Sequence, residues 1–600
     1  MSVHKVCSVG VCVCVCGEMV SLEWISPDTS SQSSRAAPVR MNDYDADTAF
    51  LGEWGGFQLR LVLLLCITMI PNGYCGLSII FVAGTPAHRC RVPEHGLNLT
   101  AAWRNVSIPL QEDQQPAKCS RYRLEALLAF SEEGVLPSEV NLSSVPQEGC
   151  LDGWEYDRSV YASTIVSDWD LVCEDQWKNP LTSSLFFCGV LVGSFLSGQL
   201  SDRFGRKRVL FFTLASQTTL AFIQVFSPSW MVFCILFFLT GMSHISNYLS
   251  AFVLGTEILG PRVREFFCTA GSCLFFTVGY MMLPLHAYFL RDWRRLLLGL
   301  TAPGFLLLPL WWFIPESPRW LLSQGRIAEA EAIVKNASKM NKKDPPAKIF
   351  TSLNVSGSLT YFSEQESKKT KAYNICDILR SRNIRWISIM LWLVWNMLAI
   401  SYLALSLNTS NLYGDAYLNC FLSAMAEVPA YMISWLMFHC CSRRLSLSAS
   451  LFAAGLFLLV IQLIPDDLIS LAIALEMMGK FAVTLALALV YAYSMELYPT
   501  VVRNTALGAG SMASRIGSII APYFIYLRSY SASLPYILMG SLTTTAALLS
   551  LLLPESYGMP LPETIANMQP FPGCCQKNIY KVTHTRAEAN AADRKCHDIQ

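Results

Sequence analysis

Twelve apolar stretches, each close to the length that crosses a bilayer, restrict this chain to a membrane-spanning fold. About 20 helical residues cross a hydrocarbon core that is about 30 Å thick. Lipid offers no partner to a backbone N–H or C=O, so each stretch is predicted to be a helix. The 600 residues are 53% hydrophobic and only 15% charged, which is typical of an integral membrane protein.

The stretches form two sets of six, separated by a polar interval. The first set is Leu59–Ile79, Leu181–Leu200, Val209–Val225, Met231–Leu254, Phe266–Tyr288 and Leu296–Ile314. The second set is Ile384–Leu407, Ala416–Phe438, Ser446–Ile464, Leu468–Tyr493, Thr505–Leu527 and Leu534–Leu553. We therefore predict an all-α membrane protein with an N-terminal half at 41–317, a cytoplasmic linker at 318–383, a C-terminal half at 384–556 and a cytoplasmic tail at 557–600.

Residues 1–40 contain a short Val/Cys run but no convincing signal-peptide cleavage site. The run is too brief to span a membrane. We interpret residues 1–40 as an extension upstream of a natural start at Met41, with a disordered cytoplasmic tail as the alternative.

The loop 84–178 is acidic, with 15 acidic against 8 basic residues. It carries three N-x-S/T sequons, at Asn98, Asn105 and Asn141, so we predict an extracellular, glycosylated loop. In an oxidising compartment four cysteines of this loop allow three disulfide pairings. These are Cys90, Cys119, Cys150 and Cys173, and one or two bridges are expected.

The polar interval between the halves has the opposite charge balance. Pro318 to Arg385 contain 13 basic against 6 acidic residues, so the positive-inside rule assigns this interval to the cytoplasm. An even number of helices then places both chain termini on the same side. The pattern "GRIAEAEAIVKNASK" predicts short surface helices, and any cytoplasmic scaffold partner stays unknown.

The two halves repeat one another at a constant offset of 239 residues. This offset relates Glu257 to Glu496 and Arg264 to Arg503, and it also relates the two "PES" tripeptides that follow the sixth and twelfth helices. Six-helix repeats of this kind are typical of transporters in which a central site opens to each face in turn.

Several motifs identify a family. "SDRFGRKR" at 201–208 resembles the D-R-x-G-R-[RK] loop of the major facilitator superfamily. Longer stretches, among them "PNGYCGLSIIFVAGTPAHRCRVP", "CLDGWEYDRSVYASTIVSDWDLVCED" and "ASRIGSIIAPYF", resemble the carnitine and zwitterion branch (OCTN) of the organic cation transporters, in the solute carrier 22 family. The resemblance covers residue 41 to about residue 569. It implies a twelve-helix major facilitator fold and sodium-stimulated uptake of carnitine or ergothioneine at the plasma membrane.

The resemblance also implies a gating role for a set of charged residues at the cytoplasmic helix ends. In the family these residues form a network between helices that loosens in one state of the cycle. The matching positions are Asp202, Arg203, Arg206, Glu257 and Arg264, with Glu496 and Arg503 in the second half. The alternative is that the basic residues only fix the membrane topology.

Charged residues inside the spans are costly, at about 2.5 to 3.5 kcal/mol each, and are expected to face the bundle interior. Arg515 lies deep in the eleventh helix, and a guanidinium can bind a carboxylate in bidentate fashion. The resemblance implies that Arg515 binds the substrate carboxylate. An ion pair with Glu427 is the alternative, while Glu476 and Lys480 are spaced to pair on one helix face.

A trimethylammonium group is held by aromatic faces, and two aromatic residues are candidates for this role. Tyr248 lies on the fourth helix, and Phe276 is the repeat equivalent of Arg515, 239 residues earlier. For any one aromatic residue, packing against lipid remains the default. The resemblance implies further contacts from Asn247 and Gln217. His244 stands where the branch has glutamine, three residues before Asn247, and is expected on the same helix face.

Sodium, the expected co-substrate, needs oxygen ligands. Asn72, between Pro71 and Gly73, can supply an amide oxygen, as can Asn247. The resemblance ties Glu496 to the sodium response. No cofactor, metal centre or nucleic-acid partner is expected; the partners are the lipid bilayer and a small zwitterion or organic cation.

An enzymatic function is not expected, because the sequence has neither a nucleotide-binding G-x-x-x-x-G-K-[ST] loop nor an H-E-x-x-H motif. Two alternatives to sodium-linked zwitterion uptake remain. One is sodium-independent transport of organic cations such as tetraethylammonium. The other is a receptor or scaffold without transport, in which the large extracellular loop is the working surface.

Overall fold

The computed structural model describes residues 44–93, 99–110, 116–346, 349–350, 380, 382–412, 414–465, 468–499, 502–557, 559 and 562. The predictions for residues 1–40, for the sequon at Asn98 and for nearly all of the tail at 557–600 therefore lie outside the described residues.

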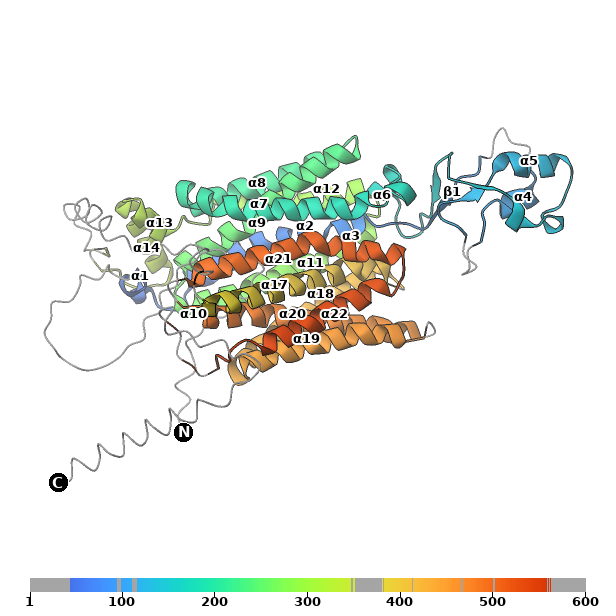
Figure 1. Cartoon of the computed structure of the whole chain (residues 1–600). Helices are drawn as coiled ribbons and strands as arrows, with labels where there is room; N and C mark the ends of the chain where they lie inside the picture. The colour runs from blue at the N-terminus through green and yellow to red at the C-terminus, as the bar shows by residue number, and fades with distance from the viewer. Residues whose placement is uncertain are drawn as a thin grey trace, which may run out of the picture.

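Twelve long helices form the body of the protein (Figure 1). Those of the N-terminal half are α2 (Gly56–Leu77), α7 (Lys178–Phe204), α8 (Arg206–Gln224), α9 (Trp230–Ile258), α11 (Ser272–Phe289) and α12 (Trp293–Leu307). Those of the C-terminal half are α17 (Arg382–Asn408), α18 (Ala416–Cys440), α19 (Arg443–Val460), α20 (Ile469–Leu497), α21 (Arg503–Tyr526) and α22 (Leu534–Leu551). Each coincides with one predicted stretch.

Ten of the twelve are by themselves long and apolar enough to cross a membrane, and the other two are α8 and α21. Helix α8 begins with three basic residues, and α21 is rich in glycine and serine and carries Arg515. Polar spans are tolerated where the polar groups face the bundle interior instead of lipid.

Shorter elements connect and cap these helices. The short α-helices are α1 (Tyr44–Asp47), α3 (Ile79–Val82), α4 (Ala101–Val106), α5 (Leu124–Glu132), α6 (Ile165–Asp168), α10 (Pro261–Phe266), α13 (Pro318–Ser323) and α14 (Ile327–Met340). A π-helical turn at Phe267–Gly271 separates α10 from α11, so the fifth predicted stretch is interrupted near its start.

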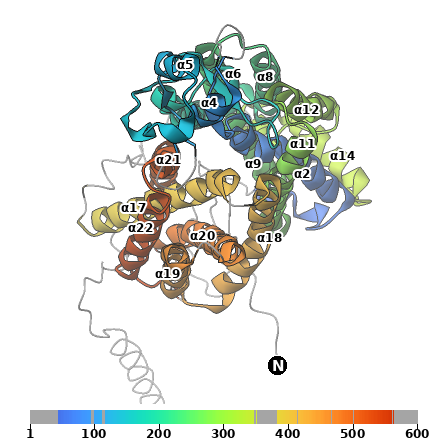
Figure 2. The same cartoon turned by 90° about the vertical axis from the view of Figure 1, so that its right-hand side faces the viewer.

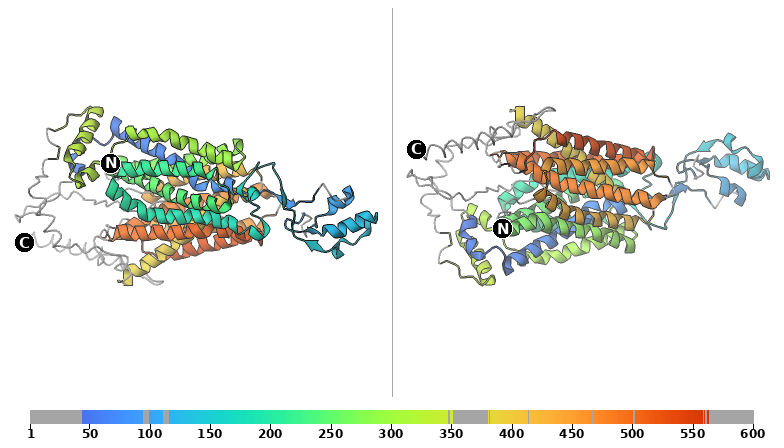
Figure 3. Two further views of the ribbon diagram at one scale, coloured as in Figure 1. Left: turned by 90° about the horizontal axis from the view of Figure 1, so that it is seen from above. Right: turned by 90° about the horizontal axis from the view of Figure 1, so that it is seen from below.

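The two halves lie side by side, as the view along the bundle shows (Figure 2). They meet where α7 contacts α21 and where α11 contacts α18. A small domain between α3 and α7, here called the loop domain (residues 85–177), projects from one end of the bundle. Helices α13 and α14 lie at the opposite end, here called the linker end (Figures 1 and 3).

Close helix contacts depend on glycine. A Cβ atom on Gly73 of α2 would lie 2.0 Å from the carbonyl oxygen of Phe276, and one on Gly279 of α11 would lie 2.2 Å from that of Ile70. Both distances are far inside van der Waals contact, so a side chain at either position would push α2 and α11 apart. Small residues at a helix interface let backbones approach closely inside a membrane.

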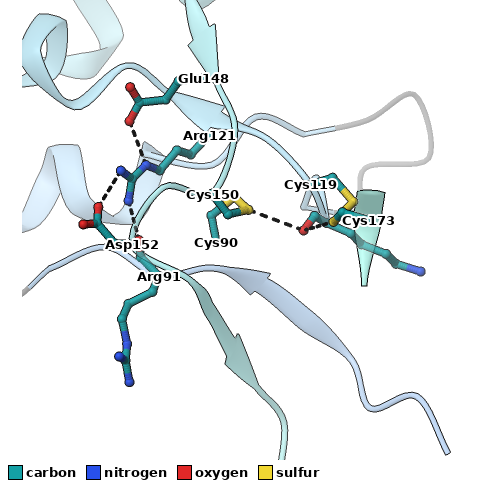
Figure 4. The surroundings of a disulfide bond; sticks show 9 residues. Cys90, Arg91, Cys119, Arg121, Glu148, Cys150, Asp152 and Cys173 are labelled. Carbon is teal, nitrogen blue, oxygen red and sulfur yellow. Dashed lines mark hydrogen bonds and ion pairs between the residues drawn. A yellow bond between two sulfur atoms is a disulfide. The ribbon is translucent and has the colours of Figure 1, made fainter. Parts of the chain in front are cut away.

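Two short antiparallel sheets and two disulfides hold the loop domain together (Figure 4). Strand β1 (His88–Cys90) pairs with β4 (Trp154–Tyr156), and β2 (Arg121–Tyr122) pairs with β3 (Gln147–Glu148). The disulfides are Cys90–Cys150 and Cys119–Cys173. This pairing is one of the three that the sequence allows. The second disulfide holds Cys119 against the turn at Cys173–Asp175, which comes just before α7.

Arg121 is the central polar residue of the loop domain, and only 2% of its side chain is exposed. Its guanidinium contacts Glu148 at 2.8 Å and Asp152 at 2.6 Å, and it donates to the backbone oxygen of Arg91 (Figure 4). These contacts connect β2 to β3 and to the segment that follows Cys150.

The pattern "GRIAEAEAIVKNASK" forms helix α14, as predicted, and the shorter helix α13 precedes it in the linker. Asn341, which follows α14, ties this linker to the first membrane helix. Its Oδ1 accepts from the backbone N–H of Phe57 at 2.9 Å, and its Nδ2 donates to Gln58 Oε1 at 2.8 Å. The linker helices therefore have a defined place against α2.

Candidate functional site

A central cavity of about 110 Å³ lies between the two halves. Eight aromatic side chains line it: Phe186, Phe187, Tyr248, Phe276, Trp395, Tyr402, Tyr431 and Tyr491. His244 and Arg515 are also in its wall, and among the described residues that line it Arg515 alone carries a permanent charge. The cavity is therefore mostly apolar and aromatic, with a single guanidinium.

Arg515 and its repeat equivalent Phe276 both line this cavity, from α21 and α11. The Arg515 side chain is buried, with 6% exposure. The ring of Phe276 meets that of Tyr248 edge to face, with a centroid distance of 6.3 Å. The cavity thus receives a cationic group from one half and an aromatic pair from the other.

Glu427, which the sequence offered as a partner for Arg515, contacts a different cation. Its Oε1 lies 3.0 Å from Lys480 Nζ and accepts from the Tyr402 hydroxyl at 2.8 Å. The suggested pair of Glu476 with Lys480 is wrong. Glu476 instead accepts from Asn408 of α17 and Tyr536 of α22, whereas Lys480 forms its ion pair with Glu427 of α18.

The polar residues of α9 do not share one face, contrary to the expectation from the sequence. His244 and Tyr248 line the cavity, whereas Asn247 is fully buried against α2 and α8. With 3.6 residues per turn, positions four apart differ by about 40° and positions three apart by about 60° in the opposite sense. This difference takes Asn247 out of the cavity wall.

Gln217 is also absent from the wall of the central cavity. It lines a second cavity of about 30 Å³ between α2, α8 and α12, together with Tyr74 and Thr301. Its Oε1 is buried and has no hydrogen-bond partner among the described residues. The predicted direct contact of Gln217 and Asn247 with substrate is therefore not supported by their positions.

Asn72 and Asn247 form a buried amide pair. Asn72 Nδ2 donates to Asn247 Oδ1 at 2.8 Å, and Asn247 Nδ2 donates to the backbone oxygen of Leu210 at 3.2 Å. In the described part of the chain, Asn72 Oδ1 accepts no hydrogen bond. An amide oxygen that is buried in this way costs free energy unless a cation or water binds it.

Tyr417, which had no signal in the sequence, joins the two halves at the end that carries the loop domain. From the start of α18 its hydroxyl donates to the backbone oxygen of Val160 at 2.8 Å. Its ring stacks on Phe81 at 5.3 Å and meets Tyr288 edge to face at 5.7 Å. These contacts hold α18 against the N-terminal half at this end.

The charged residues predicted to form a gate lie at the linker end. Arg206 donates to both carboxylate oxygens of Glu257, at 2.9 to 3.1 Å, and contacts Asp202 at 2.8 Å. Asp202 is 73% exposed, and the Arg203 guanidinium lies over the ring of Phe204. The contacts of Arg206 connect α7, α8 and α9 within the N-terminal half.

The second half repeats this arrangement. Glu496 is 3.2 Å from Arg443 and accepts from the Ser556 hydroxyl at 2.6 Å. It lies at the linker end of α20 and does not line the central cavity. A direct contact between Glu496 and a cation in that cavity is therefore not supported.

Arg264 and Arg503 are equivalent in structure as well as in sequence. Arg264 donates to the backbone oxygen of Leu259 at 2.9 Å, and Arg503 donates to that of Tyr498 at 3.1 Å. Both carbonyl groups follow the C-terminal end of a long helix, α9 or α20. Each arginine thus stabilises the turn into the next helix.

Reversing the charge at Arg206 (Arg206→Glu) is expected to lower transport at least ~10-fold, because a buried charge that loses its partner costs 2 to 5 kcal/mol. The double variant Arg206→Glu/Glu257→Arg should recover part of the loss. Arg208→Glu is the control, because it makes the same charge change in the same loop at an exposed side chain. Equal losses in both single variants would mean that these charges only fix topology. Uptake per surface molecule is the measurement.

Comparison with known proteins places the chain among membrane transporters. Residues 155–567 match the sugar (and other) transporter family. The chain is 54% identical to organic cation/carnitine transporter 2 of Mus musculus over 552 residues, which cover 91% of this chain and 98% of that protein. It is 53% identical to solute carrier family 22 member 4 of Mus musculus over 548 residues, with 90% and 98% covered.

More distant similarity extends to an organic cation transporter protein of Drosophila melanogaster, with 36% identity over 531 residues, 88% of this chain and 95% of that protein. Among solved structures, the xylose transporter XylE from E. coli in an inward-open conformation has a TM-score of 0.55 at 13% identity, covering 85% of this chain and 100% of that one. This last likeness concerns the fold alone.

Proposed function

Because the chain belongs to the sugar (and other) transporter family and, within it, to the organic cation and carnitine transporters, we propose that it takes up a quaternary-ammonium zwitterion across the plasma membrane. Carnitine and ergothioneine are the candidate substrates. Transport proceeds by alternating access, with sodium as the co-substrate.

The observation that carries this proposal is the chemistry of the central cavity. Arg515, buried in an otherwise uncharged wall, suits a carboxylate, because a guanidinium binds both carboxylate oxygens in one plane. Tyr248 and Phe276 supply aromatic faces for a trimethylammonium group, which cannot donate a hydrogen bond. A substrate with both groups uses both features of the cavity, and Asn247 and Gln217 act behind its wall.

The contacts between the halves support alternating access. Tyr417 joins the halves at the loop-domain end, while Arg206–Glu257 and Arg443–Glu496 stay within their own halves at the linker end. This is the arrangement expected of an inward-facing state, and the outward-facing state requires the Tyr417 contacts to break. Asp202, Arg203, Arg264 and Arg503 belong to the same proposed gate.

The orientation in the membrane follows from the same proposal. The loop domain is extracellular, so its two disulfides lie in an oxidising compartment. Asn105 and Asn141 are exposed there, as glycosylation requires. The linker and both termini are cytoplasmic.

Radiolabelled carnitine, ergothioneine and tetraethylammonium, taken up by transfected cells with and without sodium, test the proposed function. Saturable uptake of carnitine or ergothioneine that falls when choline replaces sodium supports it. Uptake of tetraethylammonium alone, independent of sodium, would instead favour the organic cation transporter that the Drosophila relative's name describes.

The sodium site is proposed at the amide pair of the N-terminal half. Asn72 Oδ1 and Gln217 Oε1 are buried oxygens without a hydrogen bond among the described residues, and a hard cation prefers such oxygen ligands. Glu496 lies at the linker end, so its effect on sodium is indirect.

Asn72→Ala is expected to raise the sodium concentration for half-maximal uptake at least ~10-fold, the effect of losing about 1.4 kcal/mol of ion binding. Uptake without sodium should change much less. Asn396→Ala removes a matched amide from the C-terminal half, where Asn396 donates to the backbone oxygen of Ala513, and should keep the sodium response. A normal sodium titration in Asn72→Ala would exclude this residue as a ligand.

A further inference from the structure

A second pair of opposite charges lies directly behind the wall of the central cavity. Glu427 of α18 and Lys480 of α20 have exposed fractions of 0% and 1%, and their charged groups are 3.0 Å apart. Intramembrane charges of this kind are expensive and usually mark a functional site. Neither residue has a part in the transport scheme described so far.

Tyr402 lies between this pair and the cavity. Its ring lines the cavity, its hydroxyl donates to Glu427 Oε1 at 2.8 Å, and Lys480 Nζ is 3.6 Å from its ring centroid. One aromatic ring therefore separates both charges from a bound substrate. At such short range in a medium of low dielectric constant, an unbalanced charge would strongly affect a charged substrate.

Glu427 also contacts the other half of the protein, because the hydroxyl of Thr277 on α11 donates to Glu427 Oε2 at 3.5 Å. Within its own half, Lys480 Nζ donates to the Ser406 hydroxyl of α17. Among the described residues, Lys480 is the cation that forms an ion pair with Glu427.

We propose that Lys480 determines which substrate charge the transporter accepts, by neutralising Glu427 behind Tyr402. Arg515 and Lys480 each contribute +1 and Glu427 contributes −1, so the charges of these three groups sum to +1. A zwitterion brings a carboxylate that Arg515 can bind, whereas a simple monovalent cation does not. This inference rests on the proposed zwitterion transport.

Removing the charge of Lys480 should therefore change selectivity and not only activity. In Lys480→Met the three groups sum to zero, and Glu427 becomes a carboxylate that Tyr402 orients next to the cavity. A monovalent cation then has an anionic partner. In Lys480→Met/Glu427→Gln the net charge returns to +1, because only Arg515 remains charged.

The test is the ratio of tetraethylammonium to carnitine uptake, measured per surface molecule. Lys480→Met is expected to raise this ratio at least ~10-fold, and the double variant should return it to within about threefold of the wild type. Glu476→Gln is the matched control, because Glu476 lies one turn away on α20, is 2% exposed and contacts Asn408 and Tyr536 instead of Tyr402. Its ratio should equal that of the wild type.

A purely structural pair would lower both uptakes together and leave the ratio unchanged, and that result overturns the proposal. If Lys480→Met does not reach the surface, Glu427→Gln makes the opposite charge change. Glu427→Gln should lower the ratio at least ~10-fold, and an unchanged ratio in this variant would also overturn the proposal. Wild-type protein that takes up tetraethylammonium but neither carnitine nor ergothioneine would refute the proposed function itself, which separates the two failures.

Discussion

Arg515→Ala is expected to lower carnitine uptake at least ~30-fold, because truncating one partner of a buried charge pair costs 2 to 5 kcal/mol. The substrate carboxylate would then enter a cavity of about 110 Å³ whose remaining lining is mostly aromatic and apolar. Tetraethylammonium has no carboxylate, so its uptake should stay within about threefold of the wild type. The loss should therefore separate zwitterions from simple cations.

Arg515→Lys refines this prediction. Lysine keeps the positive charge but cannot bind both carboxylate oxygens in one plane, so intermediate uptake with a raised KM is expected. Arg528→Ala, in the 3-10 turn Leu527–Ser529 that follows α21, is the control, because Arg528 lies outside the residues that line the cavity. Equal losses of carnitine and tetraethylammonium uptake in Arg515→Ala would contradict a carboxylate-binding role.

Arg121→Ala is expected to destabilise the loop domain by about 2 kcal/mol. Breaking a fully buried ion pair costs 3 to 5 kcal/mol, and the lower figure applies because Asp152 is 42% exposed. Glu148 and Asp152 would be left without their shared cation. We expect several-fold less protein at the cell surface, measured by surface biotinylation, with uptake per surface molecule little changed.

Arg123→Ala is the matched control for Arg121→Ala. Arg123 is two residues away and contacts Glu125 at 3.2 Å, but the two side chains are 55% and 81% exposed. Exposed pairs contribute little to stability, so surface expression should stay normal. If both variants behave alike, the buried contacts of Arg121 do not hold the domain together.

The sequence predicted the helices of this protein well, because each span must satisfy its own backbone in lipid. The predicted stretch Ala416–Phe438 and helix α18 (Ala416–Cys440) share their first residue. The fifth span is the exception. Its π-helical turn at Phe267–Gly271 depends on packing against neighbouring helices, which an apolar pattern does not record.

The site was predicted less completely. Arg515 could be found from the sequence, because an arginine within an apolar span must face the bundle interior or a cavity and not the lipid. Tyr402 and Tyr417 could not, because an aromatic residue suits lipid, core and cavity equally well. Asn247 was assigned to the wrong face, since a small helix rotation decides between the cavity and the neighbouring helix.

By itself, the sequence determined the number of spans, their division into two related halves and the presence of a buried arginine. These follow from the cost of placing polar groups in hydrocarbon, which acts on each segment separately. Only the tertiary structure decided that Lys480 pairs with Glu427, that Cys90 bonds to Cys150 and that Asn72 meets Asn247. Such pairings depend on how helices far apart in the chain rotate and pack against one another, and no local pattern carries that information.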